Sequence, residues 1–282
     1  MIDPQAAEAS GHGSRRTEQL IEAVRRAEVI DLAQPLEPGM PHSPNHAPFT
    51  LALVRRHGDR PRPDGSSGAS ELLIMAAHSG THIDALCHIA DRGQLHGGVD
   101  AFEAQREGRF RQLGIETVPP FIGRGVLLDV ADYRGEAPLP PAYEIDADDL
   151  EATARRQGVA IEPGDAVLIR TGWSVHWGRP DAFVGHESGV PGVGVAGAEW
   201  LCRHRIRLTG SDTLAYERIP PGQGHRLLPV HTLLLVRSGV SIVECLQLEE
   251  LARRRIYRFV LIVTPLKIVG GTGSPVRVVA LV

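Results

Sequence analysis

Hydrophobic runs and segments of helical periodicity alternate along the chain from about residue 120 to its end. The short apolar runs predict buried strands, and the amphipathic segments between them predict helices. The predicted strands span residues 125–131, 165–171, 207–210, 259–268 and 276–282. The predicted helices span residues 146–157, 197–204, 231–237 and 248–254. Because strands and helices interleave, the pattern indicates the α/β or α+β class.

The beginning of the chain has a different pattern. Residues 1–16 are polar and are expected to be flexible, whereas residues 17–28 predict a short amphipathic helix built on Leu20, Ile21 and Val24. Proline-rich and glycine-rich stretches at 35–48 and 58–68 are expected to be loops. Since no linker-like stretch follows residue 30, we expect residues 1–28 to precede a single domain over residues 29–282.

Composition and charge exclude several classes of partner. The chain is 42% hydrophobic and 23% charged, as is typical of soluble globular proteins. Its 34 acidic and 30 basic residues give a net charge of −4, so neither nucleic acid nor an anionic membrane is an expected partner. Lys267 is the only lysine, which leaves little scope for lysine-based catalysis.

The cysteines and the hydropathy pattern indicate a compartment. Cys87, Cys202 and Cys245 are odd in number and widely spaced, which does not fit a disulfide framework and favours the reducing cytoplasm. The N-terminus lacks the apolar segment of a signal peptide, and no apolar run approaches 18 residues. We therefore expect a cytoplasmic protein that does not enter a membrane.

The strongest chemical signal is the segment His78–His88, which reads His-Ser-Gly-Thr-His-Ile-Asp-Ala-Leu-Cys-His. Imidazole and carboxylate groups are the ligands that suit zinc, manganese or iron, and histidine is the commonest general acid or base near neutral pH. His78, His82, Asp84 and His88 are all at even positions, so an extended chain would present them on one face.

A straight strand cannot bring the first two histidines to one ion. At ~3.3 Å per residue, His78 and His82 would lie roughly 13 Å apart, whereas metal–ligand bonds are about 2 Å. The chain must therefore bend, and Gly80 tolerates the necessary backbone angles. We expect a curved strand that gathers His78, His82 and Asp84 at a metal, with His88 nearby. Because structural zinc sites usually contain several cysteines, a catalytic site with an open coordination position is favoured.

Three ligands leave such a site incomplete, so further ligands are expected from elsewhere in the chain. Glu244 lies in an apolar run, where a charge requires a partner, and His231 begins a helical segment. Both are candidate ligands; the alternatives are a partly exposed glutamate and a helix-cap histidine. The glycine-rich run at 270–274 fits neither common phosphate-loop pattern and is expected to be a tight turn between strands.

In this order along the chain, the residues resemble the cyclase family of metal-dependent hydrolases, which includes kynurenine formamidase, isatin hydrolase and cyclic-imide hydrolase members. The family motif HxGTHxDxPxH is matched from His78 to His88, except that Leu86 replaces the proline. Further matching segments are Asp31-Leu32, Gly39-Met40-Pro41, Gly125–Asp129, Arg170–Trp173, Gly210–Thr213, Glu217, Pro265–Lys267 and Gly270–Arg277. The replacement of the family proline by Leu86 is expected to affect the shape of the pocket and not the metal ligands.

The resemblance implies a swivelling β/β/α domain with a mixed sheet and flanking helices, usually assembled as a homodimer or homotetramer. It implies His78, His82 and Asp84 as metal ligands and His88 as the proton-transfer residue. It also implies His231 and Glu244 as ligands that complete a second metal site. The expected cofactor is one or two divalent ions, zinc or manganese.

The expected activity is hydrolysis of the C–N bond of a small amide, cyclic imide or lactam by hydroxide formed at the metal. Three alternatives remain: lactone hydrolysis or cyclisation in the same scaffold, a metal-containing binding protein without turnover, and a cysteine hydrolase using Cys87. The last is disfavoured because Cys87 and His88 are adjacent and would point to opposite faces of an extended chain.

Several other residues have two possible roles. Asp212 and Glu217 either support the metal ligands and shape the pocket or make structural hydrogen bonds. The odd-numbered Ser79 and Thr81 are expected to orient the backbone. Four aromatic residues are candidates for a pocket wall, although core packing is the more usual role: Phe49, Trp173, Trp177 and Tyr216.

Overall fold

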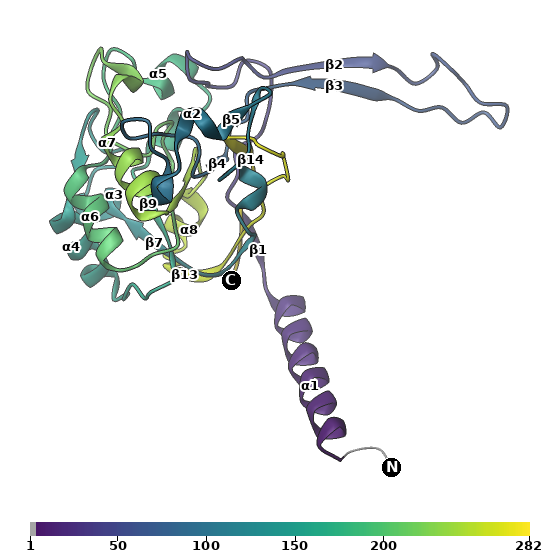
Figure 1. Ribbon diagram of the computed structural model, residues 1–282, viewed down its shortest axis with the longest axis horizontal. Coiled ribbons are helices and arrows are strands. Elements are labelled where there is room, and N and C mark those ends of the chain that lie inside the picture. Colours follow the sequence, from purple (N-terminus) through teal and green to yellow (C-terminus); the bar gives the residue numbers. More distant parts are fainter. Residues whose placement is uncertain (1–3) are drawn as a thin grey trace.

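A nine-stranded mixed sheet forms the centre of the structure, a computed structural model that describes residues 4–282, with side chains described from residue 15 onward (Figure 1). The strand order is β1-β15-β13-β7-β9-β11-β12-β4-β14. These strands are β1 Val29–Asp31, β4 His82–Asp84, β7 Phe121–Asp129, β9 Ala166–Arg170, β11 Leu208–Ser211, β12 Ser241–Glu244, β13 Arg258–Val263, β14 Gly273–Pro275 and β15 Val279–Leu281.

The middle of the sheet is parallel and its two sides are antiparallel. Strands β7, β9, β11 and β12 run parallel, whereas β13, β15 and β1 on one side and β4 and β14 on the other pair antiparallel. Residues 126–128 and 166–169 are apolar at every position because both faces of these strands are buried. Successive side chains alternate between two hydrophobic cores: Leu127 and Leu168 enter one, and Val126 and Val167 enter the other.

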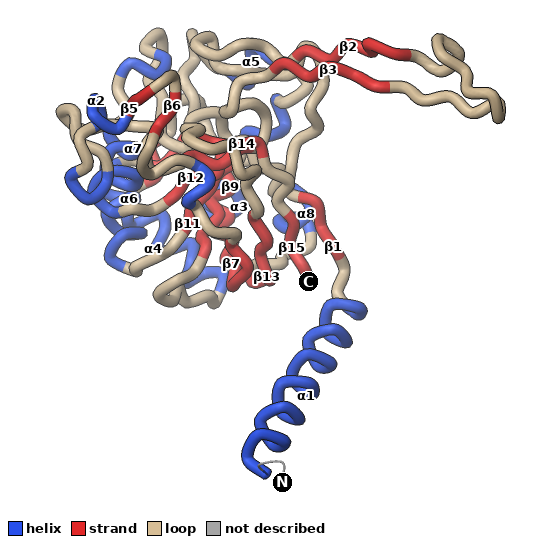
Figure 2. The backbone as a smooth tube through the Cα atoms, turned by 45° about the vertical axis from the view of Figure 1, so that its right-hand side comes forward, coloured by secondary structure: helices blue, strands red, loops and turns tan. Residues whose placement is uncertain are grey.

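Helices cover the second of these cores. They are α3 Val130–Arg134, α4 Ala147–Gln157, α6 Val195–Arg203 and α7 Pro229–His231, which continues into a π-helix at Thr232–Ser238 (Figures 1 and 2). Helix α4 begins where the Asp146 side chain accepts from the amide of Asp149 (2.9 Å), and it ends where Gly158 adopts φ +66°. Leu150 and Ala154 face the core, one turn apart.

The remaining elements are shorter or lie outside the central sheet. The helices are α1 Pro4–Arg26, α2 Ala101–Ala104, α5 Pro180–Val184 and α8 Glu249–Arg253, with 3-10 turns at His96–Gly98, Ile115–Thr117, Trp173–His176 and Gly224–Arg226. Three two-stranded sheets pair β2 Thr50–Arg55 with β3 Ser70–Ile74, β5 Gln105–Arg106 with β6 Arg109–Phe110, and β8 Glu144–Ile145 with β10 Gly192–Val193.

The mixed α/β fold expected from the sequence is confirmed, and the predicted strands at 125–131, 165–171 and 207–210 and the four predicted helices are all present. Three predictions about extent or type were wrong. The strand expected over 259–268 ends at Val263, shortly before Pro265, which cannot donate to a ladder. The strand expected over 276–282 is reduced to β15. The tight turn expected at 270–274 is present only at the start of this run, where the amide of Gly271 donates to the carbonyl of Ile268 (3.0 Å), and the run then continues into β14, which pairs with β4.

The N-terminal helix begins earlier than expected. Helix α1 starts at Pro4, not near residue 17, because a proline at the first helical turn is followed by alanine, glutamine and glutamate, which favour helix. The expected flexibility of residues 1–16 falls partly on residues 1–3, outside the described part. The single domain over residues 29–282 remains a prediction. Among the described residues, no helix is long and apolar enough to cross a membrane.

A buried ion-pair network ties the end of β9 to its neighbours. The Arg170 guanidinium donates to Asp129 Oδ1 at 2.7 Å and to both carboxylate oxygens of Glu249 at 2.9 and 2.8 Å. Arg170 and Asp129 are only 7% and 3% exposed. The arginine therefore neutralises a carboxylate that water cannot reach.

We expect Arg170→Met to lower the free energy of unfolding by about 3–5 kcal/mol, because it leaves the Asp129 charge buried without its cation. Urea denaturation of both proteins measures the difference. Arg106→Met is the control, since Arg106 pairs with Glu103 on the surface, and its loss should change stability by less than about 1 kcal/mol. Equal effects of the two substitutions would contradict this role of Arg170.

Candidate metal centre

Strand β4 brings the histidine segment into the sheet between β12 and β14. Its register places His82 directly opposite Glu244 of β12, so that both side chains project from the same face. Asp84 lies two residues further along β4 and shares that face. The sheet therefore unites two residues that are far apart in the sequence.

The chain bends immediately before β4, as the spacing of the histidines predicts. Gly80 has φ +59°, and a Cβ there would overlap the side chain of Leu36. The Thr81 hydroxyl donates to the carbonyl of Cys245 (2.6 Å) and accepts from the amide of Gln34 (2.8 Å). The expected role of Thr81 in orienting the backbone is thus confirmed.

His78, His82 and Asp84 form one compact group of potential ligands. Nδ1 of His78 lies 2.7 Å from Oδ1 of Asp84, and Nε2 of His82 lies 3.7 Å from the same oxygen. Nε2 of His82 is also 3.3 Å from Oε2 of Glu244. All four side chains are buried.

Asp84, His231 and Glu244 form a second group, which shares Asp84 with the first. Nε2 of His231 lies 3.5 Å from Oδ2 of Asp84 and 3.1 Å from Oε1 of Glu244. The two oxygens of Asp84 therefore face different sets of histidines. Glu244 likewise presents one oxygen to His82 and the other to His231.

Each of the three histidines has a polar partner on the nitrogen that points away from the centre. His82 Nδ1 donates to the carbonyl of Gly80 (2.8 Å), and His231 Nδ1 donates to Oε1 of Glu217 (2.7 Å). His78 Nε2 lies 2.9 Å from the hydroxyl of Thr272, which can accept its proton. A proton held on the outward nitrogen leaves a lone pair on the inward one, as metal ligation requires.

The donor set fits a divalent cation. Two ligand atoms at about 2.0–2.2 Å from one tetrahedral ion lie roughly 3.3–3.6 Å apart. Two of the distances above, 3.3 and 3.5 Å, lie in this range, and two more, 3.1 and 3.7 Å, lie close to it. The charge distribution also fits. Burial alone would lower the pKa of His231, but its hydrogen bonds with Asp84, Glu217 and Glu244 outweigh burial and raise it. A site that attracts a proton this strongly also attracts a metal ion in its place.

His88 lies beside this cluster and not inside it. Its ring centroid is 4.0 Å from that of His78 and 6.4 Å from that of His231. Burial lowers the pKa of His88 to about 4. The imidazole is therefore neutral at pH 7 and can accept a proton from a molecule in the adjoining cavity.

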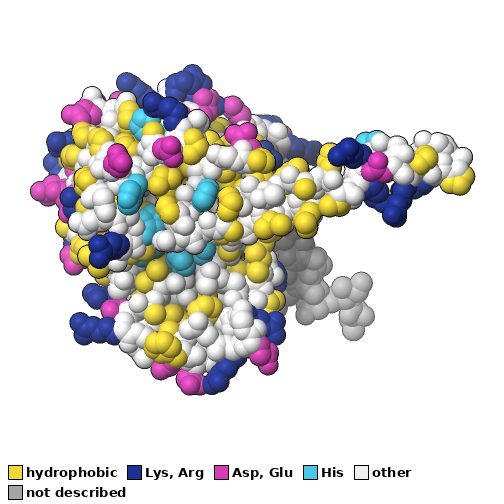
Figure 3. All heavy atoms as spheres, turned by 90° about the horizontal axis from the view of Figure 1, so that it is seen from above, with side chains coloured by type: hydrophobic (Ala, Val, Ile, Leu, Met, Phe, Trp, Pro, Cys, Tyr) yellow, Lys and Arg dark blue, Asp and Glu magenta, His cyan; other side chains and the backbone are white. Residues whose placement is uncertain are grey.

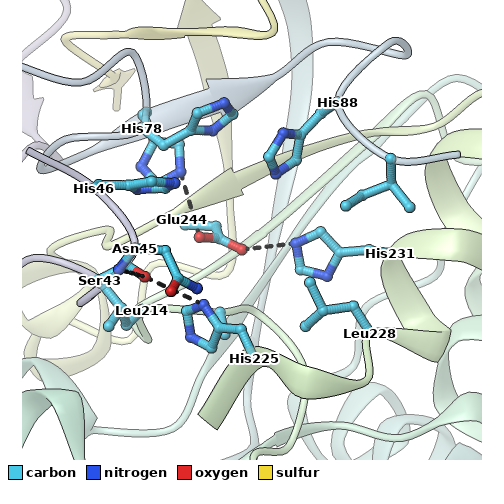
Figure 4. Close-up of a pocket in the computed structure, with 13 residues that line it drawn as sticks. Ser43, Asn45, His46, His78, His88, Leu214, His225, Leu228, His231 and Glu244 are labelled. Carbon is cyan, nitrogen blue, oxygen red and sulfur yellow. Dashed lines mark hydrogen bonds and ion pairs between the residues drawn. The ribbon is translucent and has the colours of Figure 1, made fainter. Parts of the chain in front are cut away.

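The cluster forms the floor of a cavity of about 140 Å³, whose other walls come from loops (Figure 4). The lining residues are Ser43, Asn45, His46, His78, His82, His88, Ile89, Leu214, Ala215, His225, Leu228, His231 and Glu244. Sequence reasoning assigned no role to Ser43, Asn45, His46 or His225. The ring of His46 stacks on that of His78, with 5.3 Å between the ring centroids. In the sequence, His46 could be identified only as a histidine in a proline-rich loop.

Glu217 and Asp212, which were both considered as supports for the metal ligands, make different contacts. Glu217 accepts from Nδ1 and from the backbone amide of His231, so it supports a potential ligand. The carboxylate of Asp212 instead accepts from Thr171 and Gly172, at the end of β9. Asp212 therefore holds the loop that follows β9.

The four candidate aromatic residues have the core-packing role and do not form a pocket wall. Phe49, Trp173 and Trp177 pack in a separate hydrophobic cluster with Phe183, and Tyr216 is buried in the core under the helices. None of them lines the cavity, because their large apolar surfaces are more favourably removed from water in the interior.

Leu86, which replaces the family proline, and Cys87, the candidate nucleophile, do not line the cavity. Leu86 lines a different recess with Phe121 and Leu208, so its side chain is not part of the cavity wall. Cys87 is 1% exposed, and burial raises the pKa of its thiol to about 12. A thiol with this pKa does not serve as a nucleophile at neutral pH, which disfavours the cysteine-hydrolase alternative.

We expect Thr272→Val to weaken metal binding by about 10–100-fold, because it removes the hydroxyl that orients His78. Calorimetric titration with zinc or manganese measures the affinity. Thr209→Val is the matched control: it removes another hydroxyl, which bonds to Val167 and Tyr216 inside the core. Equal affinities of the wild type and Thr272→Val would show that this hydroxyl does not support the site.

Comparison with known proteins gives concordant matches along most of the chain. A family model described as putative cyclase matches residues 30–218. The chain is 28% identical to an isatin hydrolase of Roseibium aggregatum over 262 residues, which are 90% of this chain and 92% of that protein. It is 26% identical to a kynurenine formamidase of Erythrobacter litoralis over 253 residues, 89% of this chain and 92% of that protein. A crystal structure of a novel cyclase superposes with a TM-score of 0.82 at 31% identity, covering 92% of this chain and 88% of that one.

Proposed function

This chain belongs to the cyclase family, and we propose that it is a metal-dependent hydrolase that cleaves the C–N bond of a small amide, cyclic imide or lactam. The observation that carries the proposal is the pair of ligand groups that share Asp84 at the floor of a cavity, with a neutral His88 beside them. The names of two relatives support this bond type, since isatin is a lactam and a formamidase cleaves an amide.

His78, His82 and Asp84 would hold one divalent ion, and Asp84, His231 and Glu244 a second. Such ions polarise a carbonyl oxygen and lower the pKa of water from 15.7 to about 7. We propose zinc or manganese. Two ions are favoured over one because the two oxygens of Asp84 face different histidines.

His88 is the proposed proton-transfer residue. Its neutral imidazole takes a proton from the attacking water and returns it to the nitrogen that leaves the cleaved bond. Its position over His78 and near His231 puts it within the cavity where the substrate carbonyl would lie. Ile89, Leu214 and Leu228 present an apolar wall, which packs against the hydrocarbon part of the substrate and excludes water from it.

Two further properties belong to this proposal. A cytoplasmic location fits the three cysteines, all of which are free in the structure. A homodimer or homotetramer is the expected assembly.

A panel of small substrates tests the proposed reaction. Isatin, N-formylkynurenine, cyclic imides and lactones are incubated with the metal-loaded protein, and carboxylate formation is followed. We expect at least one amide, imide or lactam to be hydrolysed. Hydrolysis of the lactones alone would contradict C–N bond cleavage.

A further inference from the structure

A recess of about 160 Å³ lies on the side of β4 that faces away from the metal cluster. Ile83, which lines it, occupies the middle of β4 between His82 and Asp84, and successive residues of a strand project from opposite faces. Among the described residues, the recess and the active-site cavity have no lining residue in common. The recess is therefore a separate space, but it adjoins the strand that carries two of the potential metal ligands.

The size and the apolar lining of the recess suit one aromatic ring. Ile83, Phe121, Leu208 and Val263 line it and are at most 5% exposed, and the partly buried Leu86 adds further apolar surface. A cavity of about 150 Å³ lined by leucine, isoleucine and phenylalanine can hold a benzene molecule. A recess of similar size and lining therefore has room for a single ring.

Two polar side chains at the recess lack a hydrogen-bond partner in the described part of the chain. Arg207 is the one charged residue among the described residues that line the recess, and its guanidinium forms no ion pair there; it lies over the ring of Phe121, 5.9 Å from the centroid. Ser241 is only 8% exposed, and its hydroxyl is likewise unpaired among these residues. Because buried polar groups are normally hydrogen-bonded, the Ser241 hydroxyl is available to a ligand in the recess.

The charge of Arg207 selects an anion. A guanidinium can donate two parallel hydrogen bonds to one carboxylate, and such charge-assisted bonds are stronger than bonds between neutral groups. Arg207, Thr117 and Pro119 are exposed, so a ligand can reach the recess from solvent. Acidic and basic side chains are interspersed over the face shown in Figure 3, so that face offers no broad positive field to an anion. An unpaired arginine beside an apolar recess is a more specific feature.

We propose that this recess is a second ligand site, which binds a single-ring aromatic carboxylate. The ring packs against Ile83, Phe121 and Leu208, and the carboxylate accepts hydrogen bonds from the Arg207 guanidinium and the Ser241 hydroxyl. Each part of the ligand thus meets a group of its own kind. The apolar lining matches the ring, and the unpaired donors match the charge.

A ligand in this recess acts on the metal centre through β4. It packs against Ile83 and so restricts movement of the strand that holds His82 and Asp84. We expect metal and carboxylate to bind cooperatively, since each favours the same position of β4 and coupling between two binding sites is reciprocal. This regulation rests on the proposed function: hydrolysis of an aromatic amide or lactam releases a carboxylate, so a product of that class would stabilise the metal-loaded enzyme.

Calorimetric titration of the full-length, metal-loaded protein with benzoate tests the site. Benzamide is the neutral probe of the same size. Arg207→Gln removes the cation from the recess, and Ser241→Ala removes the hydroxyl. Arg203→Gln is the matched control, because Arg203 is an exposed arginine of α6 that does not line the recess. Circular dichroism checks that all variants are folded.

We expect the wild type and Arg203→Gln to bind benzoate in a saturable event, at least about tenfold more tightly than benzamide, because charge-assisted hydrogen bonds require the carboxylate. Arg207→Gln should weaken this event by at least about tenfold, and Ser241→Ala should weaken it by a smaller factor. Benzoate that bound to the metal ions would bind equally well to Arg207→Gln. That result, equal binding of benzoate and benzamide, or no saturable binding would overturn the proposed site.

Zinc titrations with and without saturating benzoate test the link to the metal centre. Benzoate should tighten zinc binding at least about fivefold in the wild type and Arg203→Gln, but not in Arg207→Gln. An unchanged zinc affinity in wild type that binds benzoate through Arg207 would overturn the link. A protein that binds benzoate through Arg207 but takes up no metal would support the recess and contradict the proposed function, so the two failures are distinguishable.

Discussion

Asp84→Asn is expected to remove bound metal and to abolish hydrolysis. Asp84 is the one residue common to both ligand groups, and its two oxygens face His78 and His82 on one side and His231 on the other. An amide nitrogen cannot replace either carboxylate oxygen as a ligand. Loss of a residue that only orients a ligand weakens metal affinity by about 10–100-fold. Loss of this shared ligand should therefore weaken the affinity by more than about 100-fold.

Elemental analysis after dialysis measures the metal content of this variant, and circular dichroism confirms that it is folded. Asp148→Asn, on the exposed side of α4, is the control and should retain full metal and activity. An Asp84→Asn protein that kept a full complement of metal would show that the ligands are other residues.

His88→Gln is expected to retain the metal but to lose about 10²–10⁴-fold in turnover, the usual contribution of a general acid–base group. The reason is positional: His88 lines the cavity beside the ligands, and burial, which lowers its pKa, leaves the ring neutral with one nitrogen unprotonated. Glutamine preserves polarity and approximate size but cannot carry the proton. Turnover at saturating substrate, together with metal content, measures the effect.

His204→Gln provides the comparison, since His204 bonds to the carbonyl of Trp200 on α6, away from the cavity. Its turnover should match that of the wild type. If His88→Gln lost metal to the same degree as Asp84→Asn, the division between ligands and the proton-transfer residue would be wrong.

The grouping of His78, His82 and Asp84 could be predicted because local geometry determines it. Even spacing places His82 and Asp84 on one face of β4, and the bend at Gly80 brings His78 to the same group. The grouping of Glu244 with them depends on the pairing of β12 with β4, a tertiary fact. From the sequence, Glu244 could only be identified as a charged residue in an apolar run. Its assignment as a metal ligand came from the family resemblance.

The loop residues of the cavity could not be predicted in the same way. His46 and His225 belong to irregular segments whose positions depend on the packing of the whole chain. The glycine-rich run at 270–274 was interpreted as a turn, yet only its start is a turn; its end enters β14, and Thr272 between them contacts His78. Gly273 is required there, because a Cβ would lie 2.6 Å from Cε1 of the His78 ring. Gly273 therefore provides room for a potential ligand.

The central claim is that the Asp84-centred cluster binds the metal that the reaction requires. The most direct test is the metal content of the purified protein, measured together with hydrolysis of an active substrate before chelation, after chelation, and after zinc or manganese is restored. We predict one or two equivalents of metal per chain, loss of activity on chelation, and its recovery with the ion. Full activity in metal-free protein, or no metal uptake under any loading condition, would contradict the account.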